Sequence, residues 1–145
     1  MTLKKGNFMK QIVYEVMKEA VELGQERSQL IAQQSNDMNP RSFADYLENG
    51  FQATPLDVEI RLLTKHITSL FRALNLKDIL RVQAIMYLGL YKDYDPDAAT
   101  ETILKEQLKE TGTGNDPEIE INQFVEKDLF HEYLLEGCKI LHIAL

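Results

Sequence analysis

Six leucine and isoleucine residues in the middle of the chain constrain its fold more than any other feature. Successive members are alternately four and three residues apart, and they are Leu56, Ile60, Leu63, Ile67, Leu70 and Leu74. This spacing places all six on one face of an α-helix, whereas a half-buried strand needs an apolar residue at every second position. No stretch of the chain alternates with a period of two. The sequence therefore predicts an all-α fold without a sheet.

A second apolar run follows directly and is predicted to form the partner of this helix. The run at residues 79–90 becomes almost wholly apolar towards its end, and a helix that is apolar on every face has to be covered on every side. Thr54 and Asp57 form a helix-starting pair before the first run. Asn75 and Asp78 repeat this pair before the second run. Because almost no loop separates the two helices, we expect them to form a central helical hairpin.

Further helical segments are expected to fold against this hairpin. They are separated by turn-forming clusters rich in Asn, Asp, Gly and Pro, which interrupt helices. Their expected ranges are 7–34, 40–49, 96–111 and a last segment from 117 to nearly the C-terminus, broken near residue 127. A chain of 145 residues has the size of one ordinary domain. We therefore expect a single-domain bundle of about five to six helices, with residues 1–6 as a flexible N-terminal arm.

The composition is typical of a small acidic protein in a reducing compartment. The chain has 16 Lys and Arg residues and 23 Asp and Glu residues, which gives a net charge of −7. Cys138 is the only cysteine, so no internal disulfide can form, and we expect a cytoplasmic location. No apolar run approaches the ~20 residues that a membrane-spanning helix needs, and charged residues interrupt the N-terminal segment where a signal peptide needs an apolar core. We therefore expect no membrane partner.

Charge is distributed unevenly along the chain. Residues 60–92 carry six basic residues and one acidic residue, whereas residues 93–145 carry four basic and 13 acidic residues. One interpretation is that the acidic last third packs beside the basic middle and leaves a solvated acidic face. The other is that Arg61, Lys65 and Arg72 belong to a patch for an anionic partner. A domain with a pI near 5.0 is a poor general nucleic-acid binder, so we do not expect nucleic acid as the partner.

The last helical segment carries the most suggestive chemical residues. His131, Cys138 and His142 recur at offsets that return to nearly the same angle on a helix. A zinc site needs at least three protein ligands, but His131 would lie ~16 Å from His142 along the helix axis. The apolar neighbours of Cys138 favour a buried, inert thiol over an activated nucleophile. We therefore predict no catalytic residue, no cofactor and no metal. The alternative is that this face binds a metal or carries out catalysis, with Cys138 and His142 as candidate metal ligands.

Two stretches of the chain follow the patterns of a known family. Residues 82–93 read Val-Gln-Ala-Ile-Met-Tyr-Leu-Gly-Leu-Tyr-Lys-Asp, and residues 132–138 read Glu-Tyr-Leu-Leu-Glu-Gly-Cys. They resemble the Leu-x-Ala-hydrophobic-hydrophobic-Trp-hydrophobic-Gly-Arg-Gly-Asp helix and the C-terminal aromatic-Leu-x-x-Gly-hydrophobic helix of short acidic bacterial proteins that share a domain of unknown function. Tyr87 stands in place of the tryptophan, and Leu90 and Tyr91 in place of the Arg-Gly pair. The resemblance implies a helical fold and a bacterial origin, and it implies no activity.

The sequence leads to one main functional hypothesis and two alternatives. The absence of catalytic pairs, the apolar C-terminal segment and the charge asymmetry favour a non-enzymatic protein–protein interaction or regulatory module. Its partner would be another protein or a second copy of the chain in a homodimer. The candidate interaction residues are Arg61, Lys65, Arg72, Ile140, Leu141 and Ile143. The alternatives are the metal-binding or enzymatic role of the C-terminal face, and a regulator that binds nucleic acid or imitates it.

Overall fold

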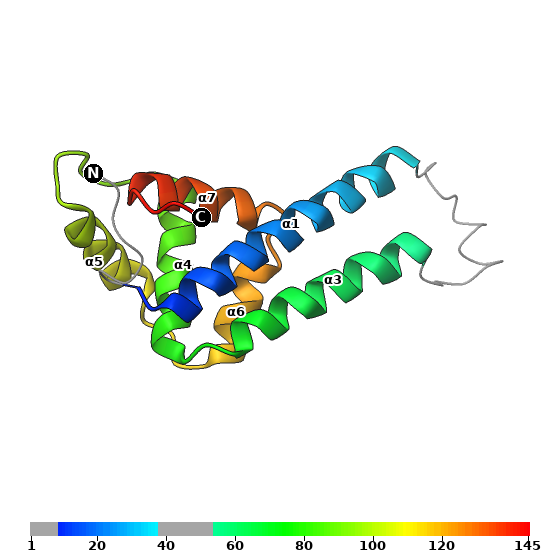
Figure 1. Ribbon diagram of the computed structural model, residues 1–145, viewed down its shortest axis with the longest axis horizontal. Coiled ribbons are helices and arrows are strands. Elements are labelled where there is room, and N and C mark those ends of the chain that lie inside the picture. The colour runs from blue at the N-terminus through cyan, green and yellow to red at the C-terminus, as the bar shows by residue number, and fades with distance from the viewer. Residues whose placement is uncertain (1–8, 38–53) are drawn as a thin grey trace.

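The computed structural model describes residues 9–37 and 54–145, and these residues form six helices and no strand (Figure 1). The helices are α1 (Gln11–Asp37), α3 (Pro55–Arg72), α4 (Leu76–Tyr91), α5 (Thr100–Thr111), α6 (Pro117–Val125) and α7 (Phe130–Ile140). The prediction of an all-α fold without a sheet is confirmed. The expected helix at 40–49 and the N-terminal arm at 1–6 lie outside the described residues. No helix in the described part of the chain is long and apolar enough to cross a membrane.

The starts of α3 and α4 follow the side-chain signals in the sequence. The Thr54 hydroxyl accepts a hydrogen bond from the Asp57 backbone N–H at 3.1 Å, and the Asp57 carboxylate accepts one from the Thr54 N–H at 2.9 Å. At α4, the Asn75 side-chain oxygen accepts a hydrogen bond from the Asp78 N–H at 2.9 Å. These bonds satisfy backbone donors that the first turn of a helix leaves free. Both predicted starts are therefore confirmed.

Helix α4 lies within the cluster of helices from which the outer halves of α1 and α3 extend (Figure 1). Its Ile79, Ile85, Met86 and Leu88 side chains are fully buried, as expected for a helix that is apolar on every face. It packs against α1, α5, α6 and α7, and the contact with α7 is the most extensive. Helix α3 does not fold back along α4 but packs against α1 and α6. The close partner of the central helix is thus α7, and the expected pairing of α4 with the preceding helix is not the one that forms.

Two glycines explain why α4 pairs with α7. A Cβ atom at Gly89 would lie 1.9 Å from the Tyr133 carbonyl oxygen, and one at Gly137 would lie 2.0 Å from the Ile85 carbonyl oxygen. Both distances are far below van der Waals contact, so only glycine lets the two backbones approach this closely. The spacing of apolar residues predicts each helix separately, but it does not predict which helices cross. The crossing depends on two glycines that lie in distant parts of the sequence.

Helices α1 and α3 run antiparallel, and their outer halves extend away from the other helices (Figure 1). We call these outer halves, residues 28–34 of α1 and 54–66 of α3, the projecting pair. None of the residues in these two ranges is buried. On the inner halves, in contrast, Val13, Met17 and Ile67 are fully buried in the core. The apolar seam of α3 is therefore covered at its inner end and only partly covered at its outer end.

Arg27 marks the base of the projecting pair. Its Nη1 donates to the Thr64 hydroxyl at 3.2 Å, and its Nη2 donates to the Lys127 carbonyl oxygen at 3.1 Å. The guanidinium also lies 5.3 Å from the centre of the Phe130 ring. The side chain is only 3% exposed, and this burial lowers the pKa of Arg27, with Asp128 acting in the opposite direction. One buried cation thus links α1, α3 and the turn between α6 and α7.

Helix α5 begins at Thr100, later than the predicted start at Pro96. The Asp95 side chain accepts a hydrogen bond from the Asp97 N–H at 3.0 Å, and the Asp95 carbonyl accepts one from the Ala98 N–H at 3.1 Å. These bonds stabilise a separate turn ahead of the helix, which is a common use of an Asp-Pro sequence. The same residue types start helices and turns, so the pattern alone does not distinguish the two.

Candidate functional site

The structure does not bring His131, Cys138 and His142 into one site. His131 and Cys138 are buried, with 4% and 2% of their surfaces exposed, whereas His142 is exposed beyond the end of α7. Within residues 9–37 and 54–145, no group of three or more His, Cys, Asp or Glu side chains is placed to hold a metal ion. The predicted stripe is wrong because it requires the helix to continue through His142.

A left-handed residue ends α7 before that point. His142 has a φ of 57°, the Ile143 N–H donates to the Cys138 carbonyl at 2.8 Å, and the His142 N–H donates to the Lys139 carbonyl at 3.1 Å. This pair of bonds is the Schellman motif, in which glycine usually occupies the left-handed position. Because histidine stands there instead, the sequence carries no visible stop signal.

The environment of Cys138 is that of a packing residue. Burial raises the pKa of its thiol to about 12, so almost none of it is thiolate, the reactive form, at neutral pH. Burial is also the main cause that lowers the pKa of His131, with Arg27 adding to the effect and Glu132 opposing it. The His131 Nδ1 atom has no hydrogen-bond partner in the described structure. The prediction that the Cys138 thiol is buried is confirmed.

The basic residues predicted for an interaction surface divide into two groups. Arg61 and Lys65 are exposed on the projecting pair. Arg72 lies at the inner end of α3, where its Nε and Nη2 atoms donate to the Glu118 carboxylate on α6 at 2.8 and 3.0 Å. This bond raises the pKa of Arg72 and lowers that of Glu118. At Arg72, the acidic last third packs beside the basic middle, as the first interpretation of the charge pattern expects.

The apolar C-terminal residues are largely used within the molecule itself. Leu141 is fully buried, and Ile140 and Ile143 are partly buried and pack against the core. The prediction that Leu141 is available to a partner is wrong, because the turn after α7 folds its side chain inward. This segment therefore offers less free apolar surface than its sequence suggests.

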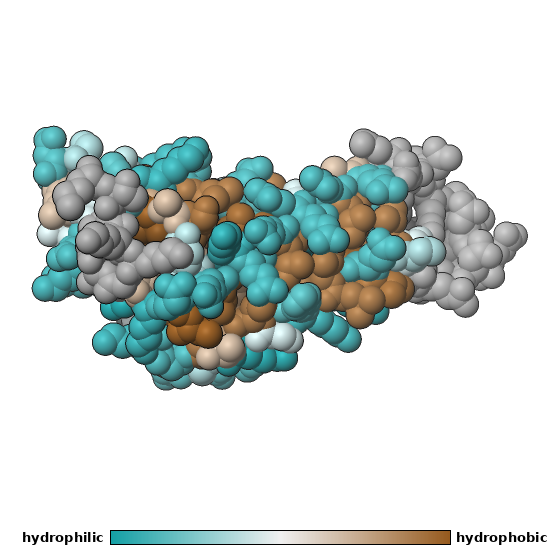
Figure 2. All heavy atoms as spheres, viewed as in Figure 1, coloured by the Kyte–Doolittle hydropathy of each residue, from teal (hydrophilic) through white to brown (hydrophobic). Residues whose placement is uncertain are grey.

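The projecting pair carries the free apolar surface instead. Val58 is 45% exposed and Leu62 is 59% exposed, and five further aliphatic residues on the pair are only partly buried: Leu30, Ile31, Leu56, Ile60 and Leu63. Figure 2 shows a broad hydrophobic area, in brown, over the part of the surface that these outer helix halves occupy. Two helices cover each other on one side only, which leaves their remaining apolar atoms in contact with solvent.

A polar pocket lies between α4, α6 and the connection from α5 to α6. Its volume is about 390 Å³, and it is lined by Gln83, Tyr87, Tyr91, Thr111, Thr113, Gly114, Glu120 and Gln123. Gln83 is 1% exposed and Glu120 is 8% exposed. The Gln83 Nε2 atom donates to the Glu120 carboxylate at 2.5 Å, and the Gln83 Oε1 atom has no hydrogen-bond partner in the described structure. Two polar side chains are thus held in the interior at the edge of a cavity.

Two stacked tyrosines form a wall of this pocket. The rings of Tyr87 and Tyr91 are nearly parallel, at an interplanar angle of 6°, with centroids 5.8 Å apart. Burial is the first cause that raises the pKa of Tyr87, followed by the proximity of Tyr91 and Glu120. The Lys127 ammonium lies 5.8 Å from the centre of the Tyr87 ring. The pocket thus combines aromatic faces with a carboxylate.

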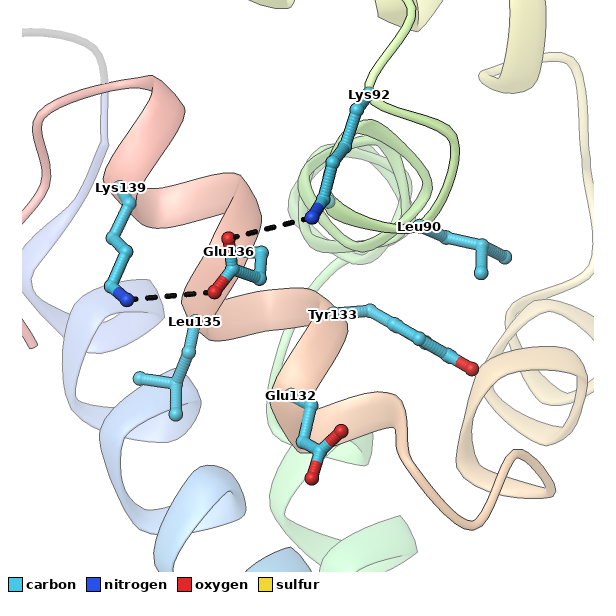
Figure 3. A pocket seen from close by; sticks show the side chains of 8 residues that line it. Leu90, Lys92, Glu132, Tyr133, Leu135, Glu136 and Lys139 are labelled. Carbon is cyan, nitrogen blue, oxygen red and sulfur yellow. Dashed lines mark hydrogen bonds and ion pairs between the residues drawn. The ribbon is translucent and has the colours of Figure 1, made fainter.

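A second pocket lies where the end of α4 meets α7 (Figure 3). Its volume is about 450 Å³, and it is lined by Gly89, Leu90, Lys92, Glu132, Tyr133, Leu135, Glu136 and Lys139. Glu136 lies between two cations, with its carboxylate oxygens 3.9 Å from Lys92 Nζ and 3.5 Å from Lys139 Nζ, as the dashed lines show. Because this carboxylate already has cationic partners, the second pocket has weaker reason to bind a charged ligand than the polar pocket.

Gln83 and Glu120 are the site residues that sequence reasoning missed. Gln83 is the one polar residue between Val82 and Met86 in an otherwise apolar stretch, which is a signal that could have been followed. Glu120 lies two residues after the exposed Glu118 on α6, and its burial depends on how α6 meets α4. Its position could not be read from local sequence.

Comparison with known proteins gives no relative for this chain. No family model matches it, and neither the curated proteins nor the solved structures contain a significant match. The resemblance to a bacterial family of short acidic proteins stays a prediction.

Proposed function

We propose that the protein is a non-enzymatic interaction module that binds a second copy of itself through the projecting pair. The observation that carries this proposal is the lack of any buried residue at positions 28–34 and 54–66, although these positions include seven Leu, Ile and Val residues. Exposed apolar surface of this extent is typical of an interaction site. We further propose a bacterial, cytoplasmic setting, on the basis of the family resemblance and the single cysteine.

The charge of the projecting pair favours a second copy as the partner. Residues 28–34 contain no charged residue, and the charges of residues 54–66 cancel, since Asp57 and Glu59 are balanced by Arg61 and Lys65. The whole chain carries −7, so two copies repel each other on average. A neutral apolar surface is where two acidic copies can meet without that repulsion.

Helix geometry gives the expected form and strength of the complex. Two projecting pairs that pack face to face form a four-helix bundle, in which the apolar stripes of all four helices are covered. At 1.5 Å per residue, the outer half of α3 is ~20 Å long, and two helices side by side are ~20 Å wide. A standard interface buries ~800 Å² on each partner, and this face is at or below that size. We therefore expect a weak dimer that dissociates on dilution.

Sedimentation equilibrium of wild type and two variants tests the proposal. Leu62→Glu places a charge at the centre of the exposed stripe, and Ile119→Glu is the matched control, because Ile119 is 54% exposed on α6, outside the projecting pair. Burial of a leucine contributes ~1.5–3 kcal/mol, and Leu62 is 59% exposed in the single copy, so its loss costs at least ~1 kcal/mol for each copy. The expected increase in Kd is at least ~30-fold for Leu62→Glu. Little change is expected for Ile119→Glu.

Two results would contradict self-association. One is a wild-type mass equal to a single chain up to a concentration of about 1 mM, well above the range expected for a specific dimer. The other is an equal effect of both substitutions, which would indicate general charge repulsion. Far-ultraviolet circular dichroism of each variant checks that the helices are intact.

A further inference from the structure

We propose that the polar pocket between α4 and α6 binds a small organic cation, through an alkylammonium or guanidinium group that pairs with Glu120. This inference concerns a different surface from the projecting pair and does not depend on self-association. It follows from the charge, the hydrogen-bonding groups and the size of the pocket.

Glu120 is a nearly buried carboxylate that forms no ion pair with another described residue. Its side chain lies at the pocket edge, and its hydrogen-bond donor is the neutral Gln83 amide at 2.5 Å. Among the described residues, the ion pairs involve Asp78, Glu118 and Glu136, and none involves Glu120. Glutamate is almost never buried unless it is paired. A cationic ligand in the pocket would supply the missing partner.

Two further groups that line the pocket can only accept a hydrogen bond from a ligand. The Gln83 Oε1 atom is buried and receives no hydrogen bond from residues 9–37 or 54–145. The Thr111 hydroxyl gives its proton to the Gln107 carbonyl at 2.9 Å, so its oxygen can only accept from a ligand. Together with the Glu120 carboxylate, these groups call for a ligand that donates. Ammonium and guanidinium groups donate several hydrogen bonds and accept none, whereas a carboxylate or phosphate ligand would be repelled.

The tyrosine wall favours a positive charge as well. Aromatic faces attract cations within about 6 Å of the ring centroid. One cation already lies over the Tyr87 ring, with Lys127 Nζ 5.8 Å from its centroid. Tyr91 is 67% exposed and stacks on Tyr87, so it provides an accessible second ring at the mouth of the pocket.

The size of the pocket favours a small molecule. Its volume of about 390 Å³ is near the lower end of the ~300–1,000 Å³ found for small-molecule sites. Gly114 keeps part of this space open, because a Cβ atom there would lie 2.0 Å from the Glu120 Oε1 atom. A side chain at position 114 would therefore displace the carboxylate that holds the ligand.

Nuclear magnetic resonance titration with defined probes tests the proposal. Butylammonium and agmatine present an ammonium and a guanidinium group, while 1-butanol and butyrate are neutral and anionic controls of similar size. At about 150 mM salt, which screens exposed charges, we expect saturable shifts of the Gln83 side-chain amide and the Gly114 backbone amide with the two cations only. Glu120→Gln should weaken this binding at least ~10-fold, whereas Glu101→Gln, which removes the same charge from an exposed site, should change it less than ~2-fold.

A second variant and a second background keep the outcome clear. In Gly114→Ala the new methyl group meets the end of the Glu120 side chain and not backbone, so the fold should persist while cation binding weakens. The titration is repeated in the Leu62→Glu variant, where unchanged binding shows that the pocket acts in a single copy. The proposal is overturned if no cation gives a saturable shift, if butanol binds as well as butylammonium, or if Glu120→Gln and Glu101→Gln have the same effect.

Discussion

Replacing Gly137 by alanine tests the close contact between α4 and α7, the most extensive contact between helices in the described structure. The added Cβ atom would lie 2.0 Å from the Ile85 carbonyl oxygen. A normal contact between carbon and oxygen is ~3.3 Å, so α7 would have to move by ~1.3 Å. The obstacle is a backbone carbonyl in the middle of a buried helix, and it cannot rotate out of the way.

The magnitude follows from two opposing effects. Alanine is favoured over glycine in a helix by ~1 kcal/mol, which stabilises the variant. Overpacking of a tight core costs ~1–3 kcal/mol, and a backbone clash belongs at the upper end of that range. The net expectation is a loss of ~2 kcal/mol in the free energy of unfolding. For a domain of this size, that loss lowers Tm by ~4–8 °C.

Thermal and urea unfolding followed by circular dichroism measure this effect. Gly24→Ala is the matched control, since the three atoms nearest to its Cβ atom belong to side chains, with His131 Cβ at 2.8 Å. There the gain in helix propensity and the milder clash should nearly cancel. In a double variant with Gly89→Ala, the combined loss should be smaller than the sum, because one substitution already separates the helices. An unchanged or higher Tm for Gly137→Ala would refute the close crossing.

Three further predictions follow from single residues. Burial lowers the pKa of His131 below its value in the unfolded chain, so the unfolded state binds more protons and wild-type stability should fall as pH decreases below ~6.5. Urea unfolding between about pH 7.5 and 5.5 should show a shallower fall in stability for His131→Gln than for wild type. Equal slopes would contradict a lowered pKa for His131. His142→Gly should raise the free energy of unfolding, measured in urea, by ~0.5–1 kcal/mol, because glycine adopts the φ of 57° without strain. A loss of stability would argue against a left-handed residue at the end of α7. Cys138 should react with a thiol reagent at least ~100-fold more slowly in the folded than in the unfolded protein, because burial raises its pKa to about 12. Equal reaction rates would show that the thiol is accessible.

The parts of the fold that depend on local chemistry could be predicted from the sequence. Thr54 and Asn75 start their helices through bonds to residues three positions later, and such short-range signals are visible in the sequence. The burial of α4 follows from its apolar faces, and the burial of Cys138 from its apolar neighbours. In each case the residues that decide the structure lie within one or two helical turns of each other.

The rest depends on contacts between distant segments. The pairing of α4 with α7 requires Gly89 and Gly137 to lie close together. In the sequence, either glycine alone indicates only a lower helix propensity. The polar pocket requires α6 to place Glu120 against Gln83, which no periodic pattern encodes. His142 ends α7 in a left-handed conformation that glycine usually adopts, so the local sequence does not show that the helix ends there or that Leu141 turns inward.

Backbone hydrogen exchange at two protein concentrations, roughly 50-fold apart, tests the proposed self-association most directly, because it also locates the contact. Pairing of two copies through the projecting pair predicts that amides of residues 28–34 and 54–66 exchange more slowly at the higher concentration, while those of α5 and α6 keep their rates. Rates in the projecting pair that do not depend on concentration, or protection that appears elsewhere, would contradict the account.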